Sequence, residues 1–185
     1  MKLNLNFFVA LLMVVLAIAS RFVPHPMGFA PIVATSLFGA AYFTKHWQAY
    51  TIPLVAMWIS DLLLNNLVYS YVFDGFVLFY DGCFFTYLSF VIIALAGSSV
   101  LTKVTIGRVV LSSLAASVVF FLLSNFGTWY STSMYPSTFS GLIACYTAGL
   151  PFFKNALIGD LVYCGIMFGA FEFMSARIPQ LSQSK

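Results

Sequence analysis

Residues 3–20 read LNLNFFVALLMVVLAIAS, and this uncharged apolar run points to the class of fold. A helix that crosses the hydrocarbon core of a membrane needs about 20 mostly apolar residues. Arg21 and the turn Pro24-His25-Pro26 follow the run directly, and proline restricts the backbone against a continuing helix. We therefore predict that residues 3–20 form a first transmembrane helix.

A second interpretation of this segment stays open. Lys2, the apolar run and Ala17-Ile18-Ala19 also resemble a secretory signal peptide with its cleavage site. A retained helix is the simpler account, because an arginine and a proline-rich turn follow the run.

The composition extends the membrane interpretation to the whole chain. Of the 185 residues, 62% are hydrophobic and 7% are charged, whereas about 25% of the residues in a soluble domain are charged. Eight basic and five acidic side chains are too few to cover a soluble surface. An ordinary soluble enzyme, a disordered protein and a small disulfide scaffold are excluded. The net charge of +3 is small and scattered, so we expect no nucleic-acid partner.

The chain is predicted to be one integral membrane domain over residues 1–185, an all-α fold with six transmembrane helices. The six expected spans are residues 3–20, 29–43, 50–69, 83–101, 108–130 and 155–178. The second is short and contains Pro31, and the fourth could begin near Phe76. Residues 73–82 and 140–153 are apolar but resist assignment, and the second stretch could fold back into a cavity.

The positions of Lys and Arg predict that both termini are cytoplasmic. Six basic residues then lie on the inner side and two on the outer side: Lys2, Lys45, Lys103, Arg108, Arg177 and Lys185 against Arg21 and Lys154. The outer loops, over residues 21–28, 70–82 and 131–154, are longer than the inner ones. A rigid bundle with enlarged outer loops is typical of a receptor for something that arrives from outside.

Most residues that could bind a ligand or take part in a reaction lie on this outer side. Two prolines hold His25 in a rigid turn, although an exposed loop histidine is an equally good interpretation. Asp61 and Asp160 lie within predicted spans, where an ionisable group is costly and points to function. Neighbouring Ser, Asn or Arg side chains could also satisfy both carboxylates. Lys154 opens the last span from outside, against the positive-inside tendency, which suggests a ligand or a carboxylate partner.

Two further groups flank the outer ends of the spans. Asn125 and Trp129 end the fifth span, where they could contact a ligand, or form an interfacial aromatic belt and a helix–helix hydrogen bond. Cys83 follows Gly82 at a predicted helix start, where a thiolate could ligate a soft metal and a large flat ligand could approach the glycine backbone. Cys83 could instead be an apolar filler, or form a disulfide with Cys145.

Motifs of enzymes are absent from the sequence. It contains no G-x-S-x-G, no H-E-x-x-H and no P-loop. We therefore expect a protein that is not an enzyme and that has no intrinsic cofactor.

Several stretches together resemble the S-components of energy-coupling-factor vitamin transporters of the bacterial inner membrane. They are Arg21–Pro31, Ile59-Ser60-Asp61, Phe120–Trp129, Tyr135-Pro136 and Pro151–Asp160. The resemblance is greatest to a branch of solitary cobalamin transporters. It implies a membrane protein that captures a vitamin from outside, either with a shared energy-coupling ATPase module or alone. A clear A-x-x-x-A packing signature is lacking in the first span, which weakens the case for a shared ATPase module and is compatible with the solitary form.

The resemblance also implies a binding site. Cys83 would ligate the cobalt of the transported cobalamin, and the pocket would include His25, Asp61, Tyr80 or Tyr87, and Lys154. Two alternatives remain open: a transporter of this kind for a different vitamin, and a non-catalytic structural or assembly subunit of a membrane complex.

Overall fold

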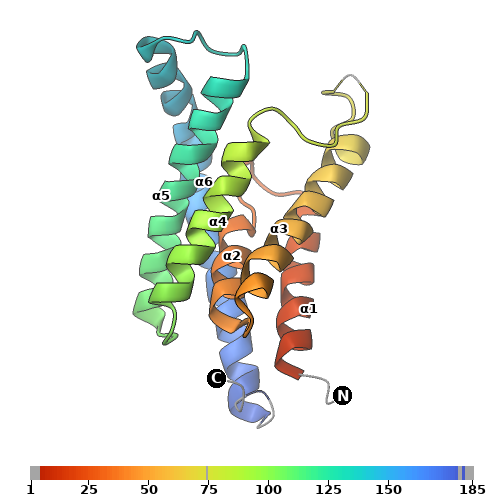
Figure 1. Cartoon of the computed structure of the whole chain (residues 1–185), viewed down its shortest axis with the longest axis vertical. Helices are drawn as coiled ribbons and strands as arrows, with labels where there is room; N and C mark the ends of the chain where they lie inside the picture. Colours follow the sequence, from red (N-terminus) through yellow and green to blue (C-terminus); the bar gives the residue numbers. More distant parts are fainter. Residues whose placement is uncertain (1–4, 74, 179–180, 182–185) are drawn as a thin grey trace.

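The computed structural model describes residues 5–73, 75–178 and 181, without the side chain of His46. These residues form six α-helices and no strand (Figure 1). The helices are α1 Leu5–Ala19, α2 Ile32–Tyr42, α3 His46–Leu63, α4 Cys83–Val100, α5 Ile106–Ser131 and α6 Phe139–Arg177. A short 3₁₀ turn, η1 (Ser20–Phe22), continues α1, and a π-helical turn, η2 (Leu64–Val68), continues α3.

Five of these helical segments are long and apolar enough to cross a membrane. They are Leu5–Phe22, Trp47–Val68, Cys83–Val100, Ile106–Ser131 and Phe139–Arg177. These segments carry few charged residues, and many of their large apolar side chains are exposed in the isolated chain. The prediction of an all-helical, multi-pass membrane protein is confirmed at this level.

The second predicted span differs from the expectation. α2 has 11 residues, about 16 Å of helix at 1.5 Å per residue, which is too short to cross a membrane alone. It begins only after Pro31 and ends where Phe43 becomes extended. α2 contacts all five other helices, and the side chains of Val33–Gly39 are buried. It is a central helix of about half the length of a span.

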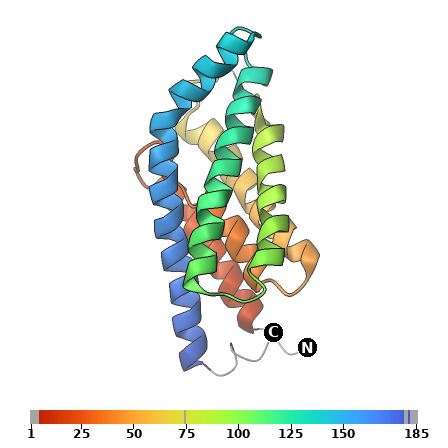
Figure 2. The same ribbon diagram turned by 90° about the vertical axis from the view of Figure 1, so that its left-hand side faces the viewer.

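The last part of the chain also differs. Residues 140–153 and 155–178, expected as a separate folded-back segment and a sixth span, form the single 39-residue helix α6 (Figure 2). Thr138 caps its start, where the hydroxyl accepts the Gly141 backbone N–H at 3.2 Å. Pro151 lies inside the helix without ending it. The expected outer loop over residues 131–154 is therefore reduced to residues 132–138.

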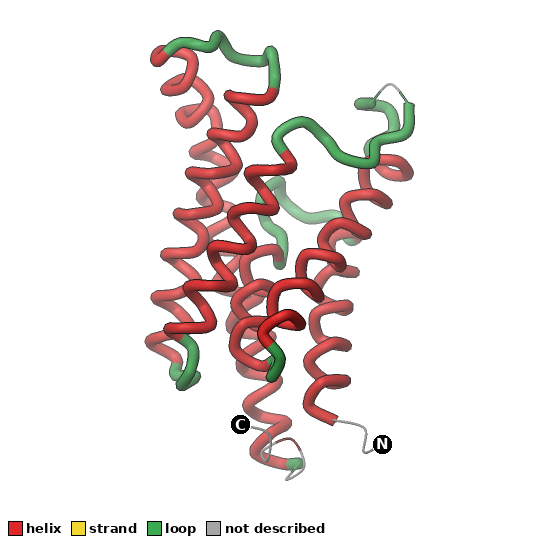
Figure 3. The backbone as a smooth tube through the Cα atoms, viewed as in Figure 1, coloured by secondary structure: helices red, strands yellow, loops and turns green. Residues whose placement is uncertain are grey.

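The start of α1 and the end of α6 lie at the same end of the bundle, which we call the proximal end (Figures 1 and 2). The short connections over residues 43–45 and 101–105 lie there too. At the opposite, distal end lie the loops over residues 69–82 and 132–138 (Figure 3). Four basic residues of the charge count belong to the proximal end, namely Lys45, Lys103, Arg108 and Arg177. Lys2 and Lys185 lie outside the described residues, as does Asp74 of the distal loop.

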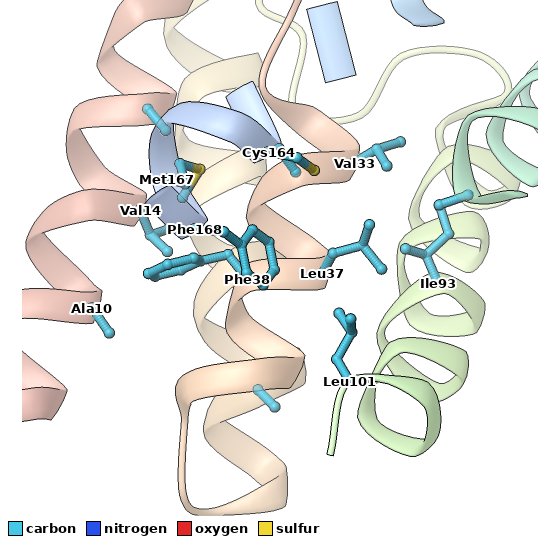
Figure 4. Close-up of a cluster of buried hydrophobic side chains, with 14 of the residues drawn as sticks. Ala10, Val14, Val33, Leu37, Phe38, Ile93, Leu101, Cys164, Met167 and Phe168 are labelled. Atoms are coloured by element: carbon cyan, nitrogen blue, oxygen red, sulfur yellow. The ribbon is translucent and has the colours of Figure 1, made fainter. Parts of the chain in front are cut away.

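The apolar core surrounds α2 in the proximal half. Phe38 is fully buried, and its ring contacts Phe168 and Phe171 of α6 edge-on, with centroids 5.5 and 5.6 Å apart. Val14 of α1 and Ile93 of α4 close the core from other sides (Figure 4). The centre of the bundle is therefore filled by side chains in this half.

Candidate functional site

A charged network joins three helices beside the distal half of the bundle. Arg21 Nη2 lies 2.8 Å from Asp61 Oδ1, and Tyr87 donates its hydroxyl to Asp61 Oδ2 at 2.8 Å. Arg21 also donates to Ser60 Oγ and, at 3.1 Å, to Met57 Sδ. The side chains of Arg21 and Asp61 are only 12% and 9% exposed. Within the described residues, Arg21–Asp61 is the only ion pair. The Asp61 carboxylate, which is costly to bury, therefore has a buried cationic partner.

Local backbone geometry produces this network. The 3₁₀ turn after α1 carries Arg21 across to α3, whose residue Asp61 lies one turn before the π-helical turn η2. Asn66 of η2 fixes the loop over residues 69–82, because its amide donates to the Val77 carbonyl and accepts the Val77 N–H, at 2.8 and 2.7 Å. The loop brings Tyr80 close to Asp61. Burial raises the pKa of the Tyr80 phenol, and the Asp61 carboxylate adds to this effect, so the phenol stays protonated.

A cavity of about 400 Å³ opens between η1, the start of α2, α5 and α6. Its size falls within the range of about 300–1,000 Å³ that is common for small-molecule sites. Most of its wall is aromatic or aliphatic, and its polar side chains come from η1 and the loop after it, from α5, and from Tyr69 at the end of η2. The main contributors are Phe120, Phe121, Phe152, Phe153, Ile32, Ala156, Arg21, His25, Ser124 and Asn125.

Close approaches of the backbone shape the cavity wall. Gly28 has a positive φ of 86°, and its Cα lies so near the Phe152 carbonyl of α6 that a Cβ would collide with it. Asn155 donates its side-chain amide to the Met27 carbonyl at 2.9 Å. These two contacts hold the loop over residues 23–31 against α6.

The wall between α5 and α6 depends on a second glycine. Gly149 lets the side chain of Asn125 lie directly against α6, and Asn125 donates its amide to the Phe121 carbonyl at 2.8 Å. The rings of Phe121 and Phe153 face each other across the same contact, with centroids 4.5 Å apart. The two helices thereby present a paired aromatic surface to the cavity.

The structure divides the predicted site residues into three groups. His25 and Asn125 line the cavity, and the Nδ1 of His25 lies 3.1 Å from the Pro26 carbonyl. Asp61, Tyr80 and Tyr87 form the network behind Arg21, which itself reaches the cavity wall. The third group, described next, lies away from the cavity.

Lys154, Trp129 and Cys83 are not part of the cavity wall. Lys154 is exposed on α6, because the continuous helix places it within the element and not at its start. Trp129 donates its Nε1–H to the Pro136 carbonyl at 2.9 Å, so it fixes the distal loop between α5 and α6.

Cys83 begins α4 as predicted and is half-buried. Gly82 before it has a φ of 83°, and a Cβ there would lie 3.1 Å from the backbone of Gly127 in α5. The glycine thus allows a close helix–helix approach, where we had expected the approach of a flat ligand. Cys83, Cys145 and Cys164 are all free thiols, so the alternative Cys83–Cys145 disulfide is not formed. In the described part of the chain, no cluster of three His, Cys, Asp or Glu side chains is arranged to hold a metal ion.

Sequence reasoning missed most of the cavity wall. Phe120-Phe121 and Phe152-Phe153 form two pairs, one on each of two packed helices. In a chain with 21 phenylalanines such pairs carry no distinctive signal. Arg21 was recognised as a charge after the first span and as part of the stretch that resembles S-components, but nothing local identifies its partner 40 positions away.

Comparisons with known proteins give one match. No curated protein and no solved structure shows significant similarity to the chain. A model of a protein family of unknown function, DUF6580, matches residues 1–181, which is nearly the whole chain. The chain therefore belongs to the DUF6580 family.

Proposed function

We propose that the protein is an integral membrane binding protein that captures a vitamin-like organic solute in the distal cavity. The observation that carries this proposal is the cavity itself, of about 400 Å³, with aromatic walls and a few polar groups that converge on it. Pockets of this size and composition bury most of a small ligand and orient it through a few polar contacts. A purely structural subunit has no need of such a space.

The chemistry of the wall favours a flat solute with a hydrogen-bond-accepting or anionic group. The rings of Phe121 and Phe153 offer surfaces for stacking. Arg21 carries five N–H donors, and its three contacts, to Asp61, Ser60 and Met57, leave donors for a ligand. The start of α2 also lies at the cavity, where Ile32 is part of the wall, and helix N-termini favour negative charge. Broken helices that direct an N-terminus at a solute are common in transporters.

We further propose the bacterial inner membrane as the location, six passages through it, and the distal end facing outward. The basic residues at the proximal end support this orientation. In this arrangement, residues 20–42 return the chain across the membrane as a loop followed by the half-length helix α2. Irregular backbone at membrane depth is tolerated when protein covers it, and α2 contacts all five other helices. Energy would come from a separate ATPase module, or the protein would act alone.

Cobalamin stays a proposal that rests on the resemblance. A corrinoid is much larger than the drug-sized ligands that a cavity of this volume holds, and Cys83 is not in the wall. Ligation of cobalt by Cys83 would require the loop over residues 69–82 to move. The cavity supports a smaller member of the same broad class, such as a heteroaromatic carboxylate.

Equilibrium binding to the purified protein in lipid nanodiscs tests the proposal. We expect nicotinate, as the probe of a flat aromatic anion, to bind, and Phe121→Ala to weaken binding about tenfold through lost stacking. Leu111→Ala is the matched control, because Leu111 is on the same helix and is 66% exposed. If the panel of nicotinate, riboflavin, biotin and cyanocobalamin shows no binding at all, the capture of a vitamin is wrong.

The same preparation tests cobalamin ligation by absorption spectroscopy. If Cys83 ligates the cobalt, cyanocobalamin or aquocobalamin shows a changed spectrum on binding, and Cys83→Ser abolishes the change. Cys145→Ser is the control thiol, since Cys145 is buried between α5 and α6. An unchanged spectrum in Cys83→Ser would eliminate sulfur ligation.

One observation favours a second function, that of an assembly subunit. A groove of about 520 Å³ runs between α1 and α3, and its wall is almost wholly apolar, including Leu11, Val15, Val55, Ile59 and Leu63. A helix of another membrane protein could pack there. Co-purification of a stable partner that dissociates on Ile59→Trp, together with no solute binding, would support this function over capture.

A further inference from the structure

A second buried carboxylate lies directly below the cavity. Asp160 of α6 is 2% exposed, and its Oδ2 lies 2.6 Å from the hydroxyl oxygen of Ser117 in α5. The backbone N–H of Val33, in the first turn of α2, also hydrogen-bonds this carboxyl group. Asp160 therefore lies where three helices meet, but unlike Asp61 it has no arginine beside it.

Over the described residues of α1, α2, α5 and α6, no charged side chain faces Asp160. α1 has no titratable residue over Leu5–Ala19, and the one in α2, Tyr42, lies at the far end and bonds Glu172 at 2.6 Å. In α5 the titratable residues, Arg108 and Tyr130, lie at the two ends. On α6 the nearest are Tyr163 and the Cys164 thiol, three and four residues further along, and the Tyr163 hydroxyl hydrogen-bonds Ser20 Oγ at 2.8 Å. An isolated charge in such a place is costly, whereas a neutral carboxylic acid is not.

The hydrogen bonds around Asp160 can be completed in two ways. The Ser117 hydroxyl has one proton but two oxygen neighbours, Asp160 Oδ2 at 2.6 Å and the Ser113 carbonyl at 2.9 Å. When Asp160 is protonated, its O–H donates to Ser117, and Ser117 donates to the Ser113 carbonyl. When Asp160 is ionised, Ser117 turns its proton to the carboxylate, which also accepts the Val33 N–H. A proton can thus bind or leave without stranding a buried polar group.

The position of Asp160 connects this site with the cavity. Ala156, one turn before Asp160 on α6, lines the cavity, and so does Ile32, the neighbour of Val33 at the start of α2. On α5, Phe120 lies three residues after Ser117 and also belongs to the wall. The residues that hold Asp160 are therefore neighbours, along each of three helices, of the residues that form the cavity floor.

We propose that Asp160 is a proton-binding site that couples solute binding in the cavity to pH. This inference rests on the proposed function as far as the solute is concerned. Arg21 contributes +1 and Asp61 −1 near the cavity, so their charges cancel. An ionised Asp160 adds −1 below the floor and repels an anionic solute, whereas protonation removes this charge. One proton, taken from water on the cavity side, would therefore bind together with one anionic solute.

The proton site itself is tested without any solute, by infrared difference spectroscopy of the protein in nanodiscs. We expect the C=O stretch of a protonated carboxylic acid that disappears as the pH rises and is absent in Asp160→Asn. Ser117→Ala removes the hydroxyl between Asp160 and Ser113 and should shift the pH at which the band disappears. This variant tests the assignment if Asp160→Asn fails to fold. Asp81→Asn is the control, because Asp81 is exposed in the distal loop. A carboxylic acid band that persists in Asp160→Asn, or no such band, would overturn the assignment.

Coupling is tested by nicotinate binding between pH 5 and 9, at constant sodium. We expect the affinity of the wild type to fall by on the order of tenfold as Asp160 ionises, with uptake of one proton per nicotinate measured by calorimetry in two buffers. Asp160→Asn should bind with the acid-side affinity at every pH. A pH-independent affinity of the wild type, or one set by sodium, would overturn the coupling. If Asp160 titrates but no probe binds, the capture function is wrong and the proton site stands.

Discussion

Asp61 and Arg21 illustrate how a buried charge pair ties distant segments together. The residues are 40 positions apart, yet their side chains meet at 2.8 Å with little exposure. Removal of one partner from a buried pair leaves the other charge uncompensated, which costs about 3–5 kcal/mol. We expect Asp61→Ala to lower the thermal midpoint of the protein in detergent strongly, because it strands the Arg21 guanidinium. Circular dichroism at 222 nm during heating measures this.

A double-mutant comparison separates the energy of the ion pair from the effects of losing each side chain on its own. Arg21→Ala combined with Asp61→Ala should be less destabilising than the sum of the two single substitutions, since no charge is left alone. Tyr87→Phe, which removes one hydrogen bond to the Asp61 carboxylate, should cost about 1.5–3 kcal/mol. Additive effects of the two single substitutions would show that the ion pair contributes nothing beyond its separate parts.

At the same scale, the sequence indicated some of the site and could not have indicated the rest. An aspartate within an apolar span stands out, so Asp61 and Asp160 were recognised from the sequence alone. Their partners, Arg21 and Ser117, are ordinary residues until the fold brings them together. The aromatic cavity wall is hidden for a different reason, since phenylalanine is the common filler of this chain.

Among the elements, α6 depends on a contact that only glycine permits. A Cβ on Gly149 would collide with the Asn125 side chain and lie 3.0 Å from the Phe121 ring, both part of the cavity wall. We expect Gly149→Ala to push Asn125 into the cavity and to weaken solute binding severalfold. Gly169→Ala is the matched control on the same helix, since no neighbouring atom lies within 4 Å of its added Cβ. Gly169→Ala should be neutral or stabilise the helix by up to about 1 kcal/mol.

Equal nicotinate affinities of the two glycine variants would show that the α5–α6 contact does not shape the binding site. Isothermal titration calorimetry on both proteins in the same nanodiscs gives these affinities directly. The thermal midpoints of the two variants, measured beside them, show whether a loss of binding reflects a local change or a loss of the fold.

Element boundaries were harder to predict than element type. The long apolar runs of the spans are clear in the sequence, and α4 begins at Cys83 as expected. α6 was divided in the prediction because Pro151, Lys154 and Asn155 interrupt its apolar pattern. Tertiary contacts with α5 and with the loop at Met27 keep the helix continuous there. α2 was counted as a short span, because its burial against all the other helices cannot be read from a single sequence.

For the whole molecule, the orientation of the bundle in the membrane is testable. If the chain crosses six times, residues 45 and 103 lie on one side of the membrane and residue 134 on the other. We would place single cysteines at Lys45, Lys103 and Met134 in a chain whose native cysteines are replaced, since all three positions are exposed. A membrane-impermeant maleimide added to intact bacterial cells should label position 134 and leave positions 45 and 103 unlabelled until the cells are opened.

The positive charges at the proximal end give this orientation its physical reason. Two spans, α3 and α4, separate positions 45 and 103, so labelling of position 45 from outside with position 103 still protected would mean that one of these two helices does not cross the membrane. Labelling of both 45 and 103 from outside would reverse the orientation and turn the cavity toward the cytoplasm, where capture of a solute from outside is impossible.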